Sequence, residues 1–499
     1  MTKTNTIDKL KFASLFIISW GFILLFYSTA LSNTIPGAML KIGGYIIDNH
    51  QIPTYDIISW NPVDKLNFIC DNWLSAVLIK IVYSISNAGL FAMIAIISFI
   101  VCSIIIIYNR KNTSQSLLLS TMLLFLIIAI ARNLSLDSGI FVILLFTILL
   151  FILNTYYKKD SFSIYFLPII SLLWANIQGS TSNFFYIVAL IYLVGHSFKY
   201  KIKIFEVKKA ESKKSLKLLI ITFISILAMM INPYGVKIIT LPYTNDLDFT
   251  VINLLKGFKS PDAKDMSIVL FCLVPFVLIL IALITSNRKM ELQDFLMYAV
   301  FAFLTLRSEY YLIFFIISAS FYIFDYIILP NKITFKTRSV SLKPAMALTV
   351  IAIAALSFIF VHTNAQSHFI NQKLDQNFIK LIKNDKPKRL FNATALSSDL
   401  IYNDIPVFID ENYLVYRDYN LNDYKILNSL ILTDSSGEIQ HNKKVTLKNI
   451  VPYYIDKYKF DKILISKNSR MYQYLINHSD KYPLITDSFE FAYFDVNNK

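Results

Sequence analysis

The sequence predicts a polytopic α-helical membrane protein with about eleven transmembrane helices and a C-terminal extracytoplasmic α/β domain. The first observation is composition: of 499 residues, 55% are hydrophobic and 16% are charged, and the mean hydropathy is +0.53. Such values are typical of chains that fold in lipid. The second observation is that long apolar runs alternate with short basic loops, and the third is that these runs stop near residue 364.

The apolar runs define the predicted spans. The first, Phe12 to Ser32, follows Lys3, Lys9 and Lys11, and its length exceeds that of a usual signal-peptide core. We therefore expect an uncleaved anchor with a cytoplasmic N-terminus. The further runs expected to span the membrane are residues 89–108, 115–131, 138–156, 163–177, 182–197, 217–232, 266–286, 292–306, 309–329 and 344–362.

Basic residues orient these spans. They gather in alternate connections, namely Arg110-Lys111, Lys158-Lys159, Lys199 to Lys217, Arg288-Lys289 and Lys332 to Lys343. Basic loops stay in the cytoplasm, and an odd number of spans then places the C-terminus outside. The predicted location is a cell inner membrane. Because the net charge of +15 lies mostly in these loops, we ascribe it to contact with membrane lipid and exclude nucleic acid as a partner.

The segment 33–87 between the first two spans is too polar to cross a bilayer and is interrupted by glycine and proline. It carries four carboxylates and a histidine: Asp48, Asp56, Asp64, Asp71 and His50. Carboxylates beside hydrocarbon are costly unless they face water or a site. We expect this segment to form the floor of an active site, with residues 1–364 as its membrane scaffold.

Residues 365–499 are predicted to form a separate domain. Short apolar runs predict strands at Arg389 to Phe391, Val407 to Ile409, Lys462 to Ile465 and Phe489 to Phe494. Helices are expected at His368 to Lys383 and Arg470 to Asn477. About 130 residues are enough for a hydrophobic core of their own.

Several short motifs resemble, in the same order, those of bacterial membrane glycosyltransferases with the C-type (GT-C) fold. In the first loop the matching residues are Gly43, Ile46, Ile47, Pro53, Asp56, Ser59, Trp73 and Leu74. Later matches are Leu173-Trp174-Ala175-Asn176, Asn232-Pro233-Tyr234-Gly235, Ser260-Pro261-Asp262, Pro406-Val407-Phe408-Ile409-Asp410, and the arginines Arg132 and Arg307. The chain departs from the family pattern at Asn72 and Gln178, where the family has glutamate and histidine.

The resemblance implies a GT-C-like fold. It also implies transfer of a sugar from a polyprenyl-phosphate donor to a glycan, lipid or protein acceptor in the cell envelope. Such a transfer needs a carboxylate to take the acceptor's proton. Asp56 is the first candidate for this base, or for a ligand of a divalent cation, and Asp71 is the second carboxylate. Each has a simpler explanation, because Asp56 could cap a loop and Asp71 could cap the helix expected from Trp73.

The departing phosphate needs positive charge, and Arg132 and Arg307 are the candidates to supply it. At a span end, an arginine also reaches the lipid headgroups without any further role. His50, Asn176 and Gln178 are candidates for binding the sugar, although polar residues at helix ends often serve only the backbone. No Cys/His cluster predicts a zinc site.

Two other functions remain open. The substituted acidic positions favour a scaffold that has lost catalysis and binds a lipid-linked glycan or envelope partners. A secondary transporter is the third hypothesis, but the sequence has no internal repeat of the kind that builds many transporters.

Overall fold

A computed structural model of the chain describes residues 36–61, 68–86, 89–109, 138–197, 212–244, 274–285, 290–326, 373–410, 416, 421–430 and 450–496. The chain divides into two compact units. The helical unit contains the described residues of Val82–Thr244 and Lys256–Phe369, and the sheet unit contains those of Asn33–Ile81 and Ile370–Lys499. The predicted domain boundary at residue 364 lies outside the described residues.

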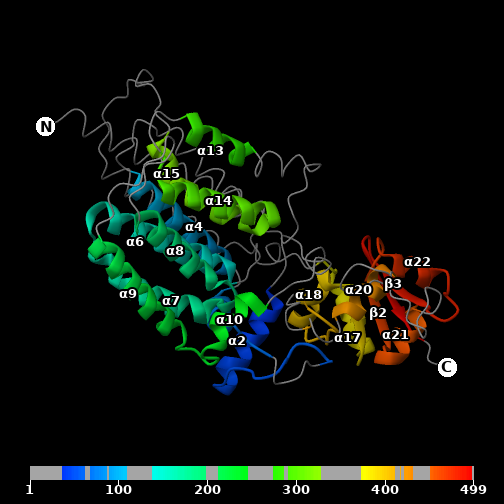
Figure 1. Cartoon of the computed structure of the whole chain (residues 1–499). Helices are drawn as coiled ribbons and strands as arrows, with labels where there is room; N and C mark the ends of the chain where they lie inside the picture. Colours follow the sequence, from blue (N-terminus) through cyan, green and yellow to red (C-terminus); the bar gives the residue numbers. More distant parts are fainter. Residues whose placement is uncertain are drawn as a thin grey trace, which may run out of the picture. The chain divides into compact units, whose positions relative to one another are not determined.

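The helical unit is a bundle in which α6, α7, α8 and α9 lie side by side (Figure 1). Helix α7 packs on α9, α4 on α6, and α14 on both α8 and α15. Its helices are α4 (Gly89–Tyr108), α6 (Gly139–Lys159), α7 (Leu167–Ile177), α8 (Asn183–Ser197), α9 (Ser212–Met229), α10 (Lys237–Thr244), α13 (Val274–Thr285), α14 (Leu292–Arg307) and α15 (Leu312–Tyr322). Short 3-10 turns join them: η2 (Phe162–Phe166), η3 (Gly179–Thr181), η5 (Glu309–Tyr311) and η6 (Ile323–Asp325).

Local chemistry sets several of these helix ends. Helix α6 stops at Asp160, whose positive φ of 54° lets its N–H bond the carbonyl oxygen of Tyr156. Helix α14 ends at Ser308, whose hydroxyl accepts a hydrogen bond from the N–H of Tyr310 and starts η5. Helices α8 and α14 approach closely at Gly195, where a Cβ would lie 2.7 Å from that of Gln293. Only glycine permits this approach.

The prediction of about eleven membrane-spanning helices, and with it the GT-C-like membrane architecture, is wrong. Among the described residues, one helix is long and apolar enough to cross a membrane: α6, with 21 residues and a hydropathy of 2.4. About 20 apolar residues are needed to cross the hydrocarbon of a bilayer. One such helix is weak support for a membrane span, because 67% of its apolar window is buried, as in the core of many proteins.

The reason for the error is helix length, which hydropathy does not reveal. The predicted spans 182–197 and 292–306 become helices of 15 and 16 residues. The span 309–329 becomes the 11-residue α15 between two 3-10 turns. The spans predicted at 12–32, 115–131 and 344–362 lie outside the described residues.

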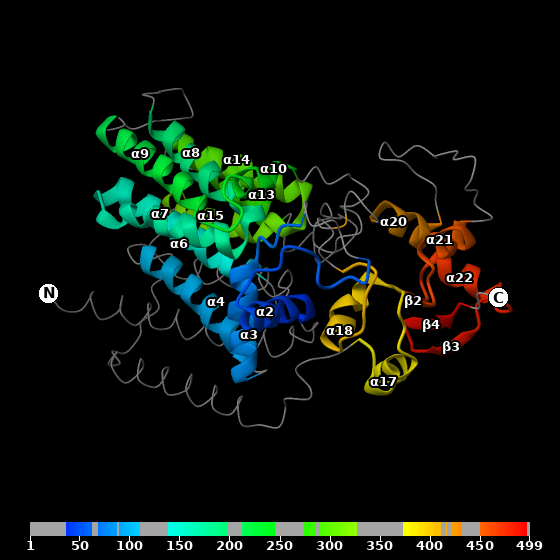
Figure 2. The same cartoon turned by 90° about the horizontal axis from the view of Figure 1, so that it is seen from below.

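The sheet unit contains a four-stranded mixed sheet in the order β1-β2-β4-β3, of which Figure 2 labels β2, β4 and β3. The strands are β1 (Leu390–Asn392), β2 (Lys462–Ser466), β3 (Leu484–Asp487) and β4 (Phe491–Asp495). Strands β1 and β2 are parallel, and the other two pairs are antiparallel. The helices of this unit are α2 (Gly37–Asn49), α17 (Gln376–Asp385), α18 (Ser397–Tyr402), α20 (Leu421–Ser429), α21 (Ile450–Tyr458) and α22 (Arg470–Ile476), with η8 (Thr394–Leu396) before α18. Helix α3 (Trp73–Ile85) is divided between the two units.

Side-chain caps begin two helices of this unit. Asp375 accepts a hydrogen bond of 2.7 Å from the N–H of Phe378 at the start of α17, and Ser469 accepts one of 3.1 Å from Tyr472 at the start of α22. Buried residues on α20, α21 and α22 form one hydrophobic core with the inner residues of β2 and β4. The strand predicted at Val407 to Ile409 is absent from the sheet and makes one isolated parallel bridge, to Ser59.

Candidate functional site

The segment that follows α2 carries the predicted base Asp56, and two glycines fix the position of α2 within the sheet unit. A Cβ at Gly37 would lie 2.2 Å from the carbonyl oxygen of Ser398 on α18. One at Gly43 would lie 2.2 Å from the carbonyl oxygen of Ala76 on α3. Because only glycine fits at such distances, both helix contacts depend on these two positions.

Ser59 and Trp60 attach this segment to the C-terminal part of the chain. The N–H of Trp60 donates to the carbonyl oxygen of Val407 (3.0 Å), and the hydroxyl of Ser59 donates to that of Phe408 (2.7 Å). The indole of Trp60 donates to the carbonyl oxygen of Leu390 (3.0 Å) and contacts the ring of Phe408, with 5.5 Å between ring centroids. Ser59 and Trp60 are therefore attached to the core of the sheet unit.

Asp56 is held by its own loop. One carboxylate oxygen, Oδ1, accepts hydrogen bonds from the N–H of Ile58 (2.8 Å) and of Ser59 (3.3 Å). The residue is only 3% exposed, and its second oxygen, Oδ2, is buried and accepts no backbone hydrogen bond among the described residues, with the Tyr416 hydroxyl beside the carboxyl. A carboxylate oxygen in that state is either a cost to the fold or a functional group.

The surroundings of Asp56 shift its protonation. Burial raises the pKa of this carboxyl, and the N–H groups of Ile58 and Ser59, the Tyr416 hydroxyl and the charge of Lys41 lower it without cancelling the rise. Burial also raises the pKa of the Tyr416 hydroxyl, and the carboxyls of Asp410 and Asp56 raise it further. The hydroxyl thus stays protonated between two carboxyl groups. A buried acid with a raised pKa beside such a donor is a common feature of active sites.

Asp71 and His50 also belong to the sheet unit. Asp71 is half-buried in the turn before α3, two residues before Trp73, the first residue of that helix. Burial raises the pKa of the neighbouring Cys70 thiol to about 12, and the charge of Asp71 contributes a smaller part of this rise. His50 is exposed and ends α2 with a positive φ of 52°. The structure thus gives His50 a role as the residue that ends helix α2.

Asn176 and Gln178 lie in the helical unit. The amide of Asn176 is buried and donates to the carbonyl oxygens of Leu172 (2.8 Å) and Ile231 (3.1 Å), which joins α7 to the end of α9. Gln178 ends α7, and its buried Oε1 has no hydrogen-bond partner among the described residues. The hydrogen bonds of Asn176 give it a structural role between two helices. Gln178 stays a candidate for binding a ligand.

One of the two predicted phosphate ligands, Arg307, is described by the structure. Arg307 is exposed at the last position of α14, and Arg132 lies outside the described residues. In the part of the chain that the structure describes, no three His, Cys, Asp or Glu side chains are placed to hold a metal ion. The divalent cation considered at Asp56 stays a prediction.

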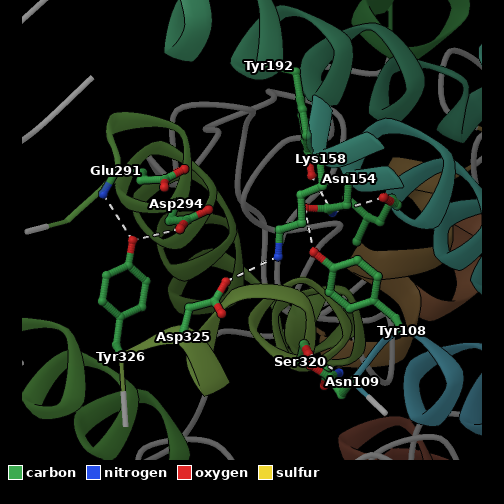
Figure 3. A network of polar contacts seen from close by, with 11 residues as sticks. Tyr108, Asn109, Asn154, Lys158, Tyr192, Glu291, Asp294, Ser320, Asp325 and Tyr326 are labelled. Carbon is green, nitrogen blue, oxygen red and sulfur yellow. Dashed lines mark hydrogen bonds and ion pairs between the residues drawn. The ribbon is translucent and has the colours of Figure 1, made fainter. Parts of the chain in front are cut away.

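Figure 3 shows polar residues of the helical unit that the sequence analysis did not single out. Tyr326 points between Glu291 and Asp294: its hydroxyl donates to a carboxylate oxygen of the buried Asp294 (2.7 Å) and accepts from the N–H of Glu291 (3.0 Å). This pair of bonds joins the start of α14 to the residue that follows η6. The presence of acidic residues within an apolar run is the sequence signal that could have identified these contacts.

A second part of this network joins α4, α6, α8 and η6. Lys158 extends toward Asp325, with 3.2 Å between Nζ and Oδ2, and lies over the ring of Tyr108. Asn154 accepts from the hydroxyl of Tyr108 and donates to that of Tyr192. These bonds all run between protein groups, so we interpret the network as a structural link between helices.

Comparison with known proteins adds no assignment. No protein-family model matches the sequence, and no curated protein matches it as a relative.

Proposed function

We propose that the protein transfers a sugar from a polyprenyl-phosphate donor to a cell-envelope acceptor at a membrane, with Asp56 as the general base. The single observation that carries the proposal is the state of the Asp56 carboxyl. One of its oxygens is fixed by the N–H groups of Ile58 and Ser59, whereas the other, Oδ2, accepts no backbone hydrogen bond among the described residues and the Tyr416 hydroxyl lies beside the carboxyl. A base needs a fixed carboxylate with one oxygen available to the acceptor.

In the proposed reaction, an oxygen of the acceptor hydroxyl forms a bond to the anomeric carbon of the sugar. The bond from that carbon to the phosphate oxygen breaks, and the polyprenyl phosphate leaves with the electron pair. The hydroxyl proton passes to Oδ2 of Asp56. The raised pKa of the carboxyl favours this step, because a more basic carboxylate holds the transferred proton better. With Asp56 only 3% exposed, the reaction also requires its loop to open.

The lipid-linked donor is supported by the surface of the helical unit. Large apolar side chains are exposed on α9, among them Leu216, Leu219, Phe223 and Leu227. Exposed apolar surface of this kind is unusual on proteins that meet only water and suits an apolar ligand or a bilayer.

The test is complementation of a deletion strain, with lipid-linked sugars as the readout. Deletion should cause the polyprenyl-phosphate sugar to accumulate, and the wild-type chain should remove it. Asp56→Asn keeps an oxygen for the two N–H groups but cannot take a proton, so it should leave the accumulated donor unchanged at normal protein levels. Full removal of the donor by this variant would rule out Asp56 as the base.

The catalytically silent scaffold is the second candidate, and one observation favours it. The contacts of Asp56 with Ile58 and Ser59 are those of a residue that shapes its own loop, and its burial keeps ligands away. A scaffold of this kind would bind the lipid-linked glycan without changing it. It predicts that deletion alters an envelope glycan, whereas the Asp56→Asn strain behaves as the wild type.

A further inference from the structure

One end of the helical unit gathers lysine and aromatic side chains from three elements. Helix α6 ends with Lys158 and Lys159, η2 follows directly, and the first turns of α9 lie beside them. The hydroxyl of Tyr156 donates to the carbonyl oxygen of Lys214 (3.1 Å). The ammonium group of Lys217 lies 4.4 Å from the ring centroid of Tyr165 in η2. These contacts hold the three elements together at one end of the bundle.

The charge of this end is positive. We name it the basic end and define it by its lysines and by the exposed aromatic residues of η2: Lys158, Lys159, Lys213, Lys214, Lys217, Phe162, Tyr165 and Phe166. The described acidic residues near it are Asp160, which is exposed, Asp325, which pairs with Lys158, and the buried Asp294 and the neighbouring Glu291. Among these described residues, five lysines stand against four acidic side chains, and burial raises the pKa of Asp294 to about 7, so the basic end keeps a small excess of positive charge.

An apolar face continues directly from the basic end. On α9 the side chains of Leu216, Leu219, Ile220, Phe223, Ile224 and Leu227 are between 46% and 61% exposed. Their spacing of three and four residues places them on one side of the helix. The other side is also apolar, with Leu218 and Ile221 buried in the bundle. Helix α7, which packs on α9, exposes Ile169 near its start.

We propose that this surface docks on an anionic lipid bilayer. The lysines would contact the headgroups, the rings of η2 would lie at the interface, and the outer face of α9 would enter the acyl chains. Three features of the surface select a bilayer. Positive charge complements anionic headgroups, and exposed rings beside lysines are typical of residues at membrane interfaces. The apolar face from Leu216 to Leu227 is about 16 Å long at ~1.5 Å per residue, close to the hydrocarbon of one leaflet.

The test is flotation of the purified full-length protein with vesicles of phosphatidylcholine, with or without phosphatidylglycerol. Each lysine at an anionic surface multiplies the affinity about five-fold. The variant Lys213→Gln/Lys214→Gln/Lys217→Gln should therefore bind phosphatidylglycerol vesicles on the order of 10- to 100-fold more weakly. Added salt should reduce the binding of the wild type, since charge drives the contact.

The matched control removes three lysines from the sheet unit: Lys457→Gln/Lys459→Gln/Lys467→Gln. It carries the same net charge as the first variant and should bind as the wild type does. Circular dichroism of both variants verifies folding. A second variant, Phe162→Ser/Phe166→Ser, keeps every lysine and should weaken binding to both kinds of vesicle.

Two results would overturn the proposal. The first is an equal loss of vesicle binding in both triple-lysine variants. That result would show that binding depends on the net charge of the protein and not on the basic end. The second is a combination of two observations: light scattering shows a dimer of the wild type that is a monomer in the basic-end variant, and the wild type binds both kinds of vesicle equally. That result would assign the face to a second copy of the chain. The inference rests on the same α9 face that supports the lipid-linked donor of the proposed function, but vesicle binding is measured without a sugar donor, so either result can fail alone.

Discussion

Replacing Asp56 with asparagine or alanine separates the effect of its charge from the effect of the hydrogen bonds that its carboxyl group accepts. Both variants lose the charge, but asparagine retains an oxygen that can accept from the N–H groups of Ile58 and Ser59. Each such hydrogen bond contributes about 0.5–1.5 kcal/mol, so the alanine variant should be ~1–3 kcal/mol less stable than the asparagine variant. The longer bond, 3.3 Å to Ser59, places the expected value in the lower half of this range.

Hydrogen exchange measured by mass spectrometry is the suitable assay, because it reports on the sheet unit within the full chain. At about 1.4 kcal/mol for each factor of ten, the alanine variant should exchange roughly 5- to 150-fold faster than the asparagine variant in β1 and β2. Equal exchange in the two variants would refute the role that we assign to Oδ1.

The pH dependence provides a second check on Asp56. Burial raises the pKa of this carboxyl in the folded protein above the ordinary value of 3.8. Its contribution to stability is therefore complete below that value and is lost as the pH rises through the higher pKa of the folded state. The asparagine variant does not titrate. The stability of the wild type relative to this variant should fall as the pH rises from about 4, and a constant difference would contradict the raised pKa.

Two further predictions concern packing in the sheet unit. Gly43→Ala would place a Cβ 2.2 Å from the carbonyl oxygen of Ala76, so it should destabilise the unit by ~1–3 kcal/mol or more in the same exchange assay. The adjacent Gly44→Ala is the control: its Cβ would approach no atom closer than 3.6 Å, and unchanged or slower exchange is expected. Asn392→Ala removes a buried amide that accepts from the N–H of Phe408 and donates to the carbonyl oxygen of Ile409, so exchange at these residues should rise by the equivalent of ~2–4 kcal/mol. Exchange as slow as in the wild type would show that the segment is held by other contacts.

The sequence predicted the parts of the sheet unit that local pattern determines. The apolar run at Lys462 to Ile465 forms most of β2, and the helix expected from Arg470 is α22. Strand β3 has no comparable signal, because its residues are largely exposed and alternate little between apolar and polar. The lengths of the helices in the helical unit could not be predicted from the sequence pattern either, because 3-10 turns such as η2 and η5 interrupt runs that remain apolar throughout.

For the candidate site, the residue type and its motif selected Asp56, but its surroundings could not be predicted. The contact of Ser59 with Phe408 joins residues 349 positions apart, and no local pattern indicates such a pairing. The same is true of Tyr416, whose place beside Asp56 depends on how the C-terminal region folds back. The first loop was expected to form the floor of an active site, and the structure buries Asp56, Ile58 and Ser59 within it.

The joining of Trp60 to Phe408 and Phe460 has a consequence for how the protein is made. At ~5–20 residues per second, a ribosome needs roughly 20 to 70 s to synthesise the chain between these partners. Throughout that time the newly made loop lacks the rings that will cover its tryptophan. The sheet unit can therefore close only after the last quarter of the chain has emerged, and a chain truncated before that point would leave the loop open to proteases and chaperones.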